Sequence, residues 1–208
     1  DRTWLPVLRR MGAQVSVALE RHGFHPAGGG RFVATIDPVA RLEPITLLER
    51  GPVTMSARAL VSGISEGIAG RELRVVHERL GVAWDALEAV SIETSPGPGN
   101  ALLIAITPTM TEVVTGFGEK NVGAGAVAGR ACAEALAYIE ADVPVGTHLA
   151  DQVLMPLALA GGGAFRTLPL STHATTNIAV LRQFLDVDVV VADEPQGTCL
   201  VTVTAGQA

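Results

Sequence analysis

At 208 residues, 48% hydrophobic and 17% charged, the chain is large enough to bury a substantial core, and its composition excludes a disordered protein. Its net charge of -6 argues against a broad basic surface for nucleic acid. The longest apolar stretch, residues 153–160, is too short to cross a membrane, no signal peptide is visible, and the two cysteines have no metal-binding spacing. We therefore expect a globular protein of the cytoplasm.

The first part of the chain predicts a short helix and a hairpin. Residues 3–11 place apolar side chains at helical spacing before Gly12, residues 15–19 alternate as a strand, and residues 31–36 supply its partner. The glycines at 28–30 lack the spacing of a phosphate-binding loop and favour a turn. Because the first helix starts without an initiator methionine, a cap or a leading strand, we expect the chain to be cut from a longer polypeptide.

The central part of the chain predicts a self-contained unit. It is expected to begin with a strand at 53–61 and a helix capped by Ser65 and ended by Gly81. Three strands follow at about 86–93, 101–107 and 112–117, with turns at 95–100 and 107–110. An alanine-rich helix at 122–140 completes the unit. The buried face of that last helix is expected to hold Val127, Ala131, Ala135, Tyr138 and Ile139. This order is typical of a small α+β domain.

The last part of the chain predicts two helices and three strands. Residues 149–160 are too densely apolar for a one-sided helix and indicate a helix buried on most of its surface. Three glycines at 161–163 end it, a strand is expected at 164–168, and an amphipathic helix carrying Ile178, Leu181 and Leu185 follows. The final strands are expected at 187–192 and 198–204.

A first polar cluster interrupts these apolar segments at His148, Asp151 and Gln152. Asp151 and Gln152 are expected in the first turn of the helix at 149–160, where an aspartate is favoured by the helix dipole. The pattern leaves two interpretations open: a simple N-terminal cap, or donors and acceptors of a site at the mouth of the helix.

A second polar cluster comprises Ser171, Thr172, His173, Thr175, Thr176 and Asn177. Thr175 or Thr176 is the expected N-cap of the next helix, which places His173 just outside its positive end. There the imidazole would stay neutral and nucleophilic, and the backbone N–H groups could hold a phosphate. A capping or solvated histidine is the alternative.

Four segments together resemble the RNA 3′-terminal phosphate cyclase family. They are residues 21–30 (RHGFHPAGGG), 97–100 (GPGN), 118–120 (GEK) and the run from His148 to Leu185, and they follow the family's order across essentially the whole chain. The resemblance implies an α+β fold, with repeated units of two helices and a four-stranded sheet in a large domain and a smaller inserted α+β domain. Residues 1–48 and 143–208 would form the large domain, and residues 49–142 the inserted one.

The resemblance also implies a reaction of the ligase class. With ATP and a divalent cation (Mg²⁺ or Mn²⁺), an RNA 3′-terminal phosphate would become a 2′,3′-cyclic phosphate through a covalent histidine-adenylate. The family nucleophile matches His173, and the block that contacts the adenylate matches His148, Leu149, Ala150, Asp151 and Gln152. The partner would be an RNA 3′-phosphate end, for which six arginines within residues 1–41 offer either a local basic patch or a solvated face.

The chain departs from the family at its N-terminus. Full-length members begin with a third that carries a glycine-rich block, arginines and a glutamine near the nucleotide and the RNA end, and this third is absent here. The chain alone is therefore expected to be inactive unless a homo-oligomer or a complementing N-terminal segment supplies those groups. His25 also stands where family members often have another aromatic residue.

Two other function classes stay open. One is a non-catalytic, cyclase-like scaffold for RNA or ribosome assembly, against which the presence of His173 argues. The other is a metal hydrolase that uses His148, Asp151 and His173, whose residue types are ordinary metal ligands. No other metal site is expected.

Overall fold

The computed structural model describes residues 1–107 and 111–206. Within them the chain forms five α-helices and ten strands in three sheets, which confirms the predicted α+β class. None of the helices in these ranges is long and apolar enough to cross a membrane. The turn predicted at 107–110 lies mostly outside the described residues.

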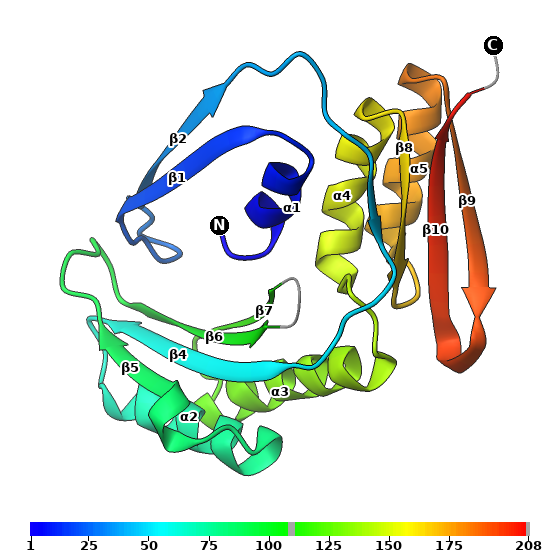
Figure 1. The fold of residues 1–208 in the computed structure, drawn as a ribbon. Helices are drawn as coiled ribbons and strands as arrows, with labels where there is room; N and C mark the ends of the chain where they lie inside the picture. The colour runs from blue at the N-terminus through cyan, green and yellow to red at the C-terminus, as the bar shows by residue number, and fades with distance from the viewer. Residues whose placement is uncertain (108–110, 207–208) are drawn as a thin grey trace.

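The central part forms a four-stranded sheet covered by two helices. Its elements are β4 (Thr54–Ser62), α2 (Gly67–Leu80), β5 (Leu87–Ser91), β6 (Gly99–Thr107), β7 (Glu112–Phe117) and α3 (Ala124–Ala141). The sheet order is β5-β4-β6-β7, with β5 parallel to β4 and the other pairs antiparallel. Both helices pack on one face of this sheet (Figure 1). The predicted element order is confirmed, although Glu66, and not Ser65, is the N-cap of α2.

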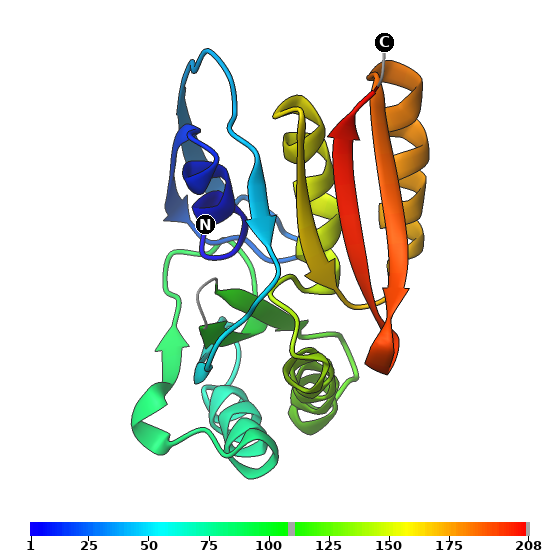
Figure 2. The same ribbon diagram turned by 45° about the vertical axis from the view of Figure 1, so that its right-hand side comes forward.

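The last part of the chain builds a second unit of the same kind. It comprises β3 (Ile45–Leu47), α4 (Thr147–Leu159), β8 (Gly162–Thr167), α5 (Thr172–Phe184), β9 (Val187–Glu194) and β10 (Thr198–Ala205), with the sheet order β3-β8-β10-β9. Strand β3 runs parallel to β8, and the other pairs are antiparallel. Phe165, Val201 and Leu154 are fully buried between this sheet and its helices. Figure 2 shows the sheet and helices as adjacent layers.

The N-terminal part adds a helix and a two-stranded sheet. Helix α1 (Trp4–Arg10) precedes β1 (Gln14–Arg21) and β2 (Arg31–Asp37), which pair antiparallel as predicted. Side chains of directly paired residues share a face, so one face of this sheet carries Val15, Val17, Leu19, Phe32, Ala34 and Ile36. The sheet projects from the rest of the molecule (Figure 1), and Phe32 and Ile36 are 66% and 72% exposed.

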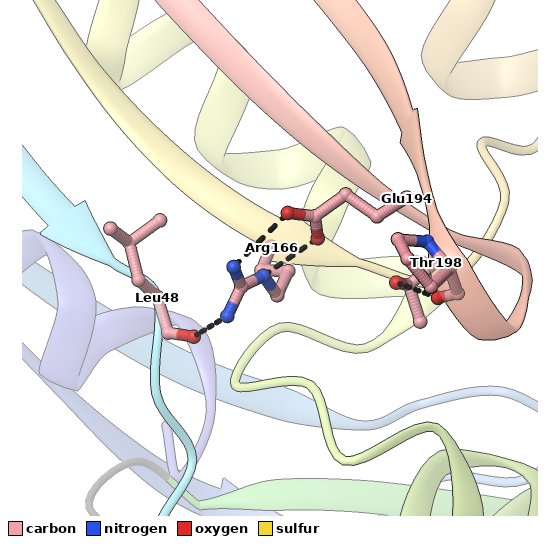
Figure 3. Close-up of polar contacts among 5 residues, drawn as sticks. Leu48, Arg166, Glu194 and Thr198 are labelled. Atoms are coloured by element: carbon pink, nitrogen blue, oxygen red, sulfur yellow. Dashed lines mark hydrogen bonds and ion pairs between the residues drawn. The ribbon is translucent and has the colours of Figure 1, made fainter.

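Two arginines fasten the linker that joins β3 to β4. Arg166 of β8 donates from Nε and Nη2 to the two carboxylate oxygens of Glu194, at 2.6 and 3.0 Å, and from Nη1 to the carbonyl of Leu48 at 3.1 Å (Figure 3). The buried Arg50 lies 2.8 Å from Asp142 through Nη2 and donates to carbonyls at the C-terminus of α3. A cation is favoured at that end of a helix. The linker is thus tied to both sheet-and-helix units.

The buried apolar side chains fall into two clusters. One joins α1, α4 and α5 to the sheet that contains β8, and the other lies between α2, α3 and the sheet that contains β4. The first cluster takes residues up to Leu47 and from Val145 onward, and the second takes residues from Ala57 to Val143. The domain division at 48/49 and 142/143 stays a prediction, and these clusters are the observation behind it.

Candidate active site

Helix α4, which carries Asp151, begins one half-turn earlier than predicted. Gly146 is its N-cap, and the Gly146 N–H donates to Oε2 of Glu112 at 3.3 Å. A Cβ at position 146 would lie 2.6 Å from the Glu112 carboxyl carbon, so the carboxyl group fits there only because residue 146 is glycine. Asp151 therefore lies in the second turn, and its interpretation as a helix cap is wrong.

The acid beside the start of α4 is unusual because it is buried. Burial raises the pKa of Glu112 to about 7, the hydrogen bond from Gly146 opposes this, and the nearby Glu134 carboxylate adds to it. Glu112 comes from β7, so a side chain of one sheet-and-helix unit contacts the first turn of a helix in the other.

Helix α5, which carries His173, also begins earlier than predicted. Ser171 is the N-cap, and its Oγ accepts a hydrogen bond from the Ala174 N–H at 3.2 Å. The prediction of Thr175 or Thr176 as the cap is wrong because Ser171, an equally good capping residue, already reaches the backbone three residues on. His173 is consequently the second residue of α5 rather than just outside it, and its exposed imidazole remains at the positive end of the helix.

The two polar clusters of the sequence meet in one pocket of about 420 Å³. Its lining comprises Asp151, Thr172, His173, Thr176, Asn177 and Val180. The Asn177 amide donates to both the backbone carbonyl and Oδ1 of Asp151, at 3.0 and 3.1 Å. This pair of hydrogen bonds fixes the Asp151 carboxylate relative to α5. The sequence pointed to Asp151 and His173, but not to Asn177 as the residue that connects them.

An apolar pocket of about 500 Å³ adjoins this polar one. Asp151 and Asn177 line both, and the second is lined otherwise by Gln152 and by apolar side chains that include Trp4, Met155 and Leu159. Ligand sites are typically apolar hollows with a few fixed polar groups, and a hollow beside a polar helix terminus suits a molecule with a flat apolar part and an anionic part.

Three residues of the predicted site line neither pocket. His148 is exposed on the first turn of α4, with Nε2 3.5 Å from Oε1 of Glu134. Leu149 and Ala150 are each 1% exposed and pack into the core beneath α4. The side chains of Leu149 and Ala150 can act only by holding the helix in place.

The metal-hydrolase alternative is not supported by the geometry. Across residues 1–107 and 111–206, no three His, Cys, Asp or Glu side chains lie close enough together to hold a metal ion. His148 pairs with α3, whereas Asp151 and His173 face the pocket at the start of α5.

Fold and pocket define an α+β protein of two sheet-and-helix units, with a histidine and an aspartate brought together at a helix N-terminus. A family model described as RNA 3′-terminal phosphate cyclase matches residues 1–191. The chain belongs to the RNA 3′-terminal phosphate cyclase family.

Individual relatives agree with the family model. A protein of Ectopseudomonas mendocina named RNA 3′-terminal phosphate cyclase is 44% identical over 192 residues, which cover 91% of this chain and 56% of that protein. Proteins of the same name from Ralstonia nicotianae and Koribacter versatilis are 44% and 40% identical over 197 and 195 residues, 93% of this chain in each case and 56% and 55% of those proteins. The chain thus spans about half the length of the curated relatives it matches.

Proposed function

We propose that the chain carries the adenylation site of an ATP-dependent RNA 3′-terminal phosphate cyclase, with His173 as the nucleophile. The observation that carries this proposal is the meeting of His173 and Asp151, from two different helices, in one pocket of a chain that belongs to the cyclase family. The alternative of a capping histidine is less favoured because Ser171 already caps α5, and the experiment below separates a catalytic from a solvated His173.

The first step would form a phosphorus–nitrogen bond. An imidazole nitrogen of His173 attacks the α-phosphorus of ATP, the bond to the β-phosphate breaks, and pyrophosphate leaves. Helix starts present backbone N–H groups without an intrahelical acceptor, and Ser171 occupies one of those of α5. The remaining ones can stabilise charge that develops on the transferred phosphate.

Asp151 and Gln152 are proposed to orient the nucleotide. Both line the apolar pocket, where the adenosine part would lie, and Asp151 also faces the polar pocket beside His173. A divalent cation, Mg²⁺ or Mn²⁺, would accompany the ATP phosphates and neutralise part of their charge. Asn177 acts through Asp151 and is therefore a positioning residue.

The later steps would transfer AMP to the RNA. An oxygen of the RNA 3′-phosphate attacks the adenylate phosphorus and frees the histidine. The adjacent 2′-hydroxyl then attacks the 3′-phosphorus, AMP leaves, and a 2′,3′-cyclic phosphate remains. Such RNA processing is proposed to take place in the cytoplasm.

The chain is proposed to work together with the part of the family's length that it does not span. The apolar face of the β1–β2 sheet supports this, since Leu19, Phe32 and Ile36 are 58%, 66% and 72% exposed. A two-stranded sheet is marginal in water by itself, and a contiguous exposed apolar surface marks an interaction site. A complementing N-terminal segment is the proposed occupant, and a second copy of the chain is the alternative.

The test is a cyclisation assay on an oligoribonucleotide with a radiolabelled 3′-phosphate. The RNA is incubated with this chain, ATP, Mg²⁺ or Mn²⁺, and the N-terminal part of a full-length relative. The RNA is then treated with phosphatase. We expect phosphatase-resistant label that requires ATP and His173. A mixture that stays inactive while the full-length relative cyclises the same RNA would favour a scaffold role.

A further inference from the structure

A third pocket, of about 480 Å³, lies where three loops meet the helices of the β4 sheet. The loops are the β1–β2 connection, the turn before β6 and the β7–α3 connection, and each includes one of the short segments singled out from the sequence. It shares no lining residue with the two pockets at α4 and α5. Nothing in the proposed adenylation mechanism uses it.

The loops around this pocket are packed too closely for side chains at two glycines. A Cβ at Gly99 would lie 2.4 Å from Cβ of Phe24, and a Cβ at Gly97 would lie 2.3 Å from Cβ of Ala27. The Gly118 N–H donates to the Asn100 carbonyl at 3.0 Å, which holds the third loop against the second. The three loops that form the pocket walls therefore pack directly against one another.

The floor of the pocket contains a carboxyl group with an unused acceptor. Glu72 of α2 is 0% exposed, and its Oε1 accepts from Nδ2 of Asn100 at 2.6 Å. Its Oε2 is buried and has no hydrogen-bond partner among the described residues. Burial raises the pKa of Glu72 to about 7, against the opposing effects of Asn100 and Arg71. Leaving a buried acceptor unpaired is costly, so this oxygen is suited to a donor group from a ligand.

The rim of the pocket is suited to an anion. Gly123, the N-cap of the 18-residue helix α3, offers no side-chain cap, so the first backbone N–H groups of α3 remain available at the pocket. Lys120, Arg71, His25 and Pro26 line the same pocket, and the Glu119 carboxylate that also lines it is paired with Arg130 at 2.6 Å. An imidazole ring can stack on an unpaired base.

We infer that this pocket binds one nucleotide of single-stranded RNA, with the phosphate at the start of α3 beside Lys120 and Arg71 and a base donor group at Oε2 of Glu72. A nucleotide combines the anion that the rim favours with the donor that the floor lacks, and every RNA base carries an N–H donor. The inference goes beyond the proposed function, because it requires no chemistry at His173. It gives the RNA strand a second anchoring point, away from the reacting end.

The experiment measures binding of a fluorescein-labelled hexacytidylate with a free 3′-hydroxyl, which offers no 3′-phosphate to react. Arg71→Ala and Lys120→Ala are each expected to raise the Kd by about fivefold or more, as loss of one phosphate contact does. The matched control is Arg74→Ala, which removes the same charge from an exposed position of α2 that does not line the pocket. Its Kd should change less than about twofold, as expected for a charge without a phosphate contact.

Photocrosslinking provides a second readout that does not depend on the variants folding. A hexamer with one 4-thiouridine is irradiated on the full chain, and the crosslinked peptides are identified by mass spectrometry. Crosslinks within residues 118–124 or at His25 are expected. The inference is overturned by equal losses in the Arg71→Ala and Arg74→Ala proteins, by crosslinks confined to α4 and α5, or by a site that binds inorganic phosphate but not the hexamer. A His173→Ala protein that retains hexamer binding keeps this result separate from the test of the adenylation site.

Discussion

The pocket between α4 and α5 and the pocket at the start of α3 use polar groups in opposite ways. In the first, the His173 imidazole is exposed, and Asp151 is half-buried and accepts two hydrogen bonds from Asn177, one on its carboxylate and one on its backbone carbonyl. In the second, the Glu72 carboxyl group is buried at the floor of the pocket and has one oxygen unpaired. The first presents groups that can react, and the second presents a group that can recognise.

The difference follows from what each task needs. A nucleophile must reach its substrate, so its position at a helix terminus matters more than its burial. A recognition group gains most from a hydrogen bond when no water competes for it. The two pockets therefore respond differently to mutation and to pH.

The largest expected effect is at His173. In the chain supplemented with the N-terminal part of a relative, His173→Ala should lower the rate of covalent labelling by α-labelled ATP by about 10³-fold or more, because it removes the atom that forms the bond. ATP binding, measured by calorimetry, should change little. His22→Ala, which lies outside both pockets, is the control, and full labelling of the His173→Ala protein would refute the assignment.

A stability effect of intermediate size is expected at Glu72. The pKa of this carboxyl group is about 7 in the folded chain against 4.5 for the ordinary group, so the folded state holds its proton more tightly. Its contribution to the free energy of unfolding is therefore full below about pH 4.5 and is lost as the pH rises to about 7, by roughly 3 kcal/mol. Glu72→Gln should remove this pH dependence.

Urea unfolding at pH 5, 6, 7 and 8 measures this slope. Glu112 has a similarly raised pKa, so the Glu72→Gln protein should keep the part of the slope that Glu112 contributes. Glu78→Gln, at an exposed position of the same helix, should leave the slope unchanged. An identical slope in the Glu72→Gln and wild-type proteins would show that Glu72 is not the buried acid described here.

A smaller effect is expected at Asn177. Asn177→Ala leaves Asp151 in place but removes both hydrogen bonds that orient it, so the labelling rate should fall by about tenfold while the Km for ATP rises less than kcat falls. The control is Thr175→Ala, an exposed residue of α5 that lines neither pocket. Equal effects of the two substitutions would indicate a general disturbance of α5.

The smallest effect is expected at Arg166. Arg166→Lys keeps the charge, but lysine cannot make the bidentate hydrogen bonds to Glu194 and the hydrogen bond to the Leu48 carbonyl at the same time. A slight fall in Tm is expected, with labelling unchanged, since neither pocket includes this residue. Arg41→Lys, an exposed arginine that pairs with Glu43 only two positions away, is the control.

Local patterns in the sequence were sufficient for the order of helices and strands except for the three-residue strand β3, which was not predicted. In α2, α3 and the strands of both sheets, apolar residues recur at the spacing of the buried face. That spacing can be recognised from neighbouring residues alone. Helix starts were less predictable. The start of α4 depends on Glu112, which is distant in the sequence, and Ser171 competes with two threonines that are also good caps.

The sites were only partly predictable for a related reason. His173 and Asp151 could be proposed as site residues from the resemblance and from their placement near helix starts. The Asn177–Asp151 contact and the unpaired oxygen of Glu72 arise only when separate elements pack together. In the sequence, Glu72 falls at helical spacing between Ala69 and Val76 on the apolar face of α2, but the sequence does not indicate that one of its oxygens stays unpaired.

The measurement that tests the central claim most directly is identification of the adenylated residue. The chain, supplemented with the N-terminal part of a relative, is incubated with ATP and a divalent cation, digested, and analysed by mass spectrometry for a peptide carrying AMP. The account predicts an acid-labile AMP adduct on the peptide that contains His173. An AMP adduct on any other residue, still formed in the His173→Ala protein, would contradict it.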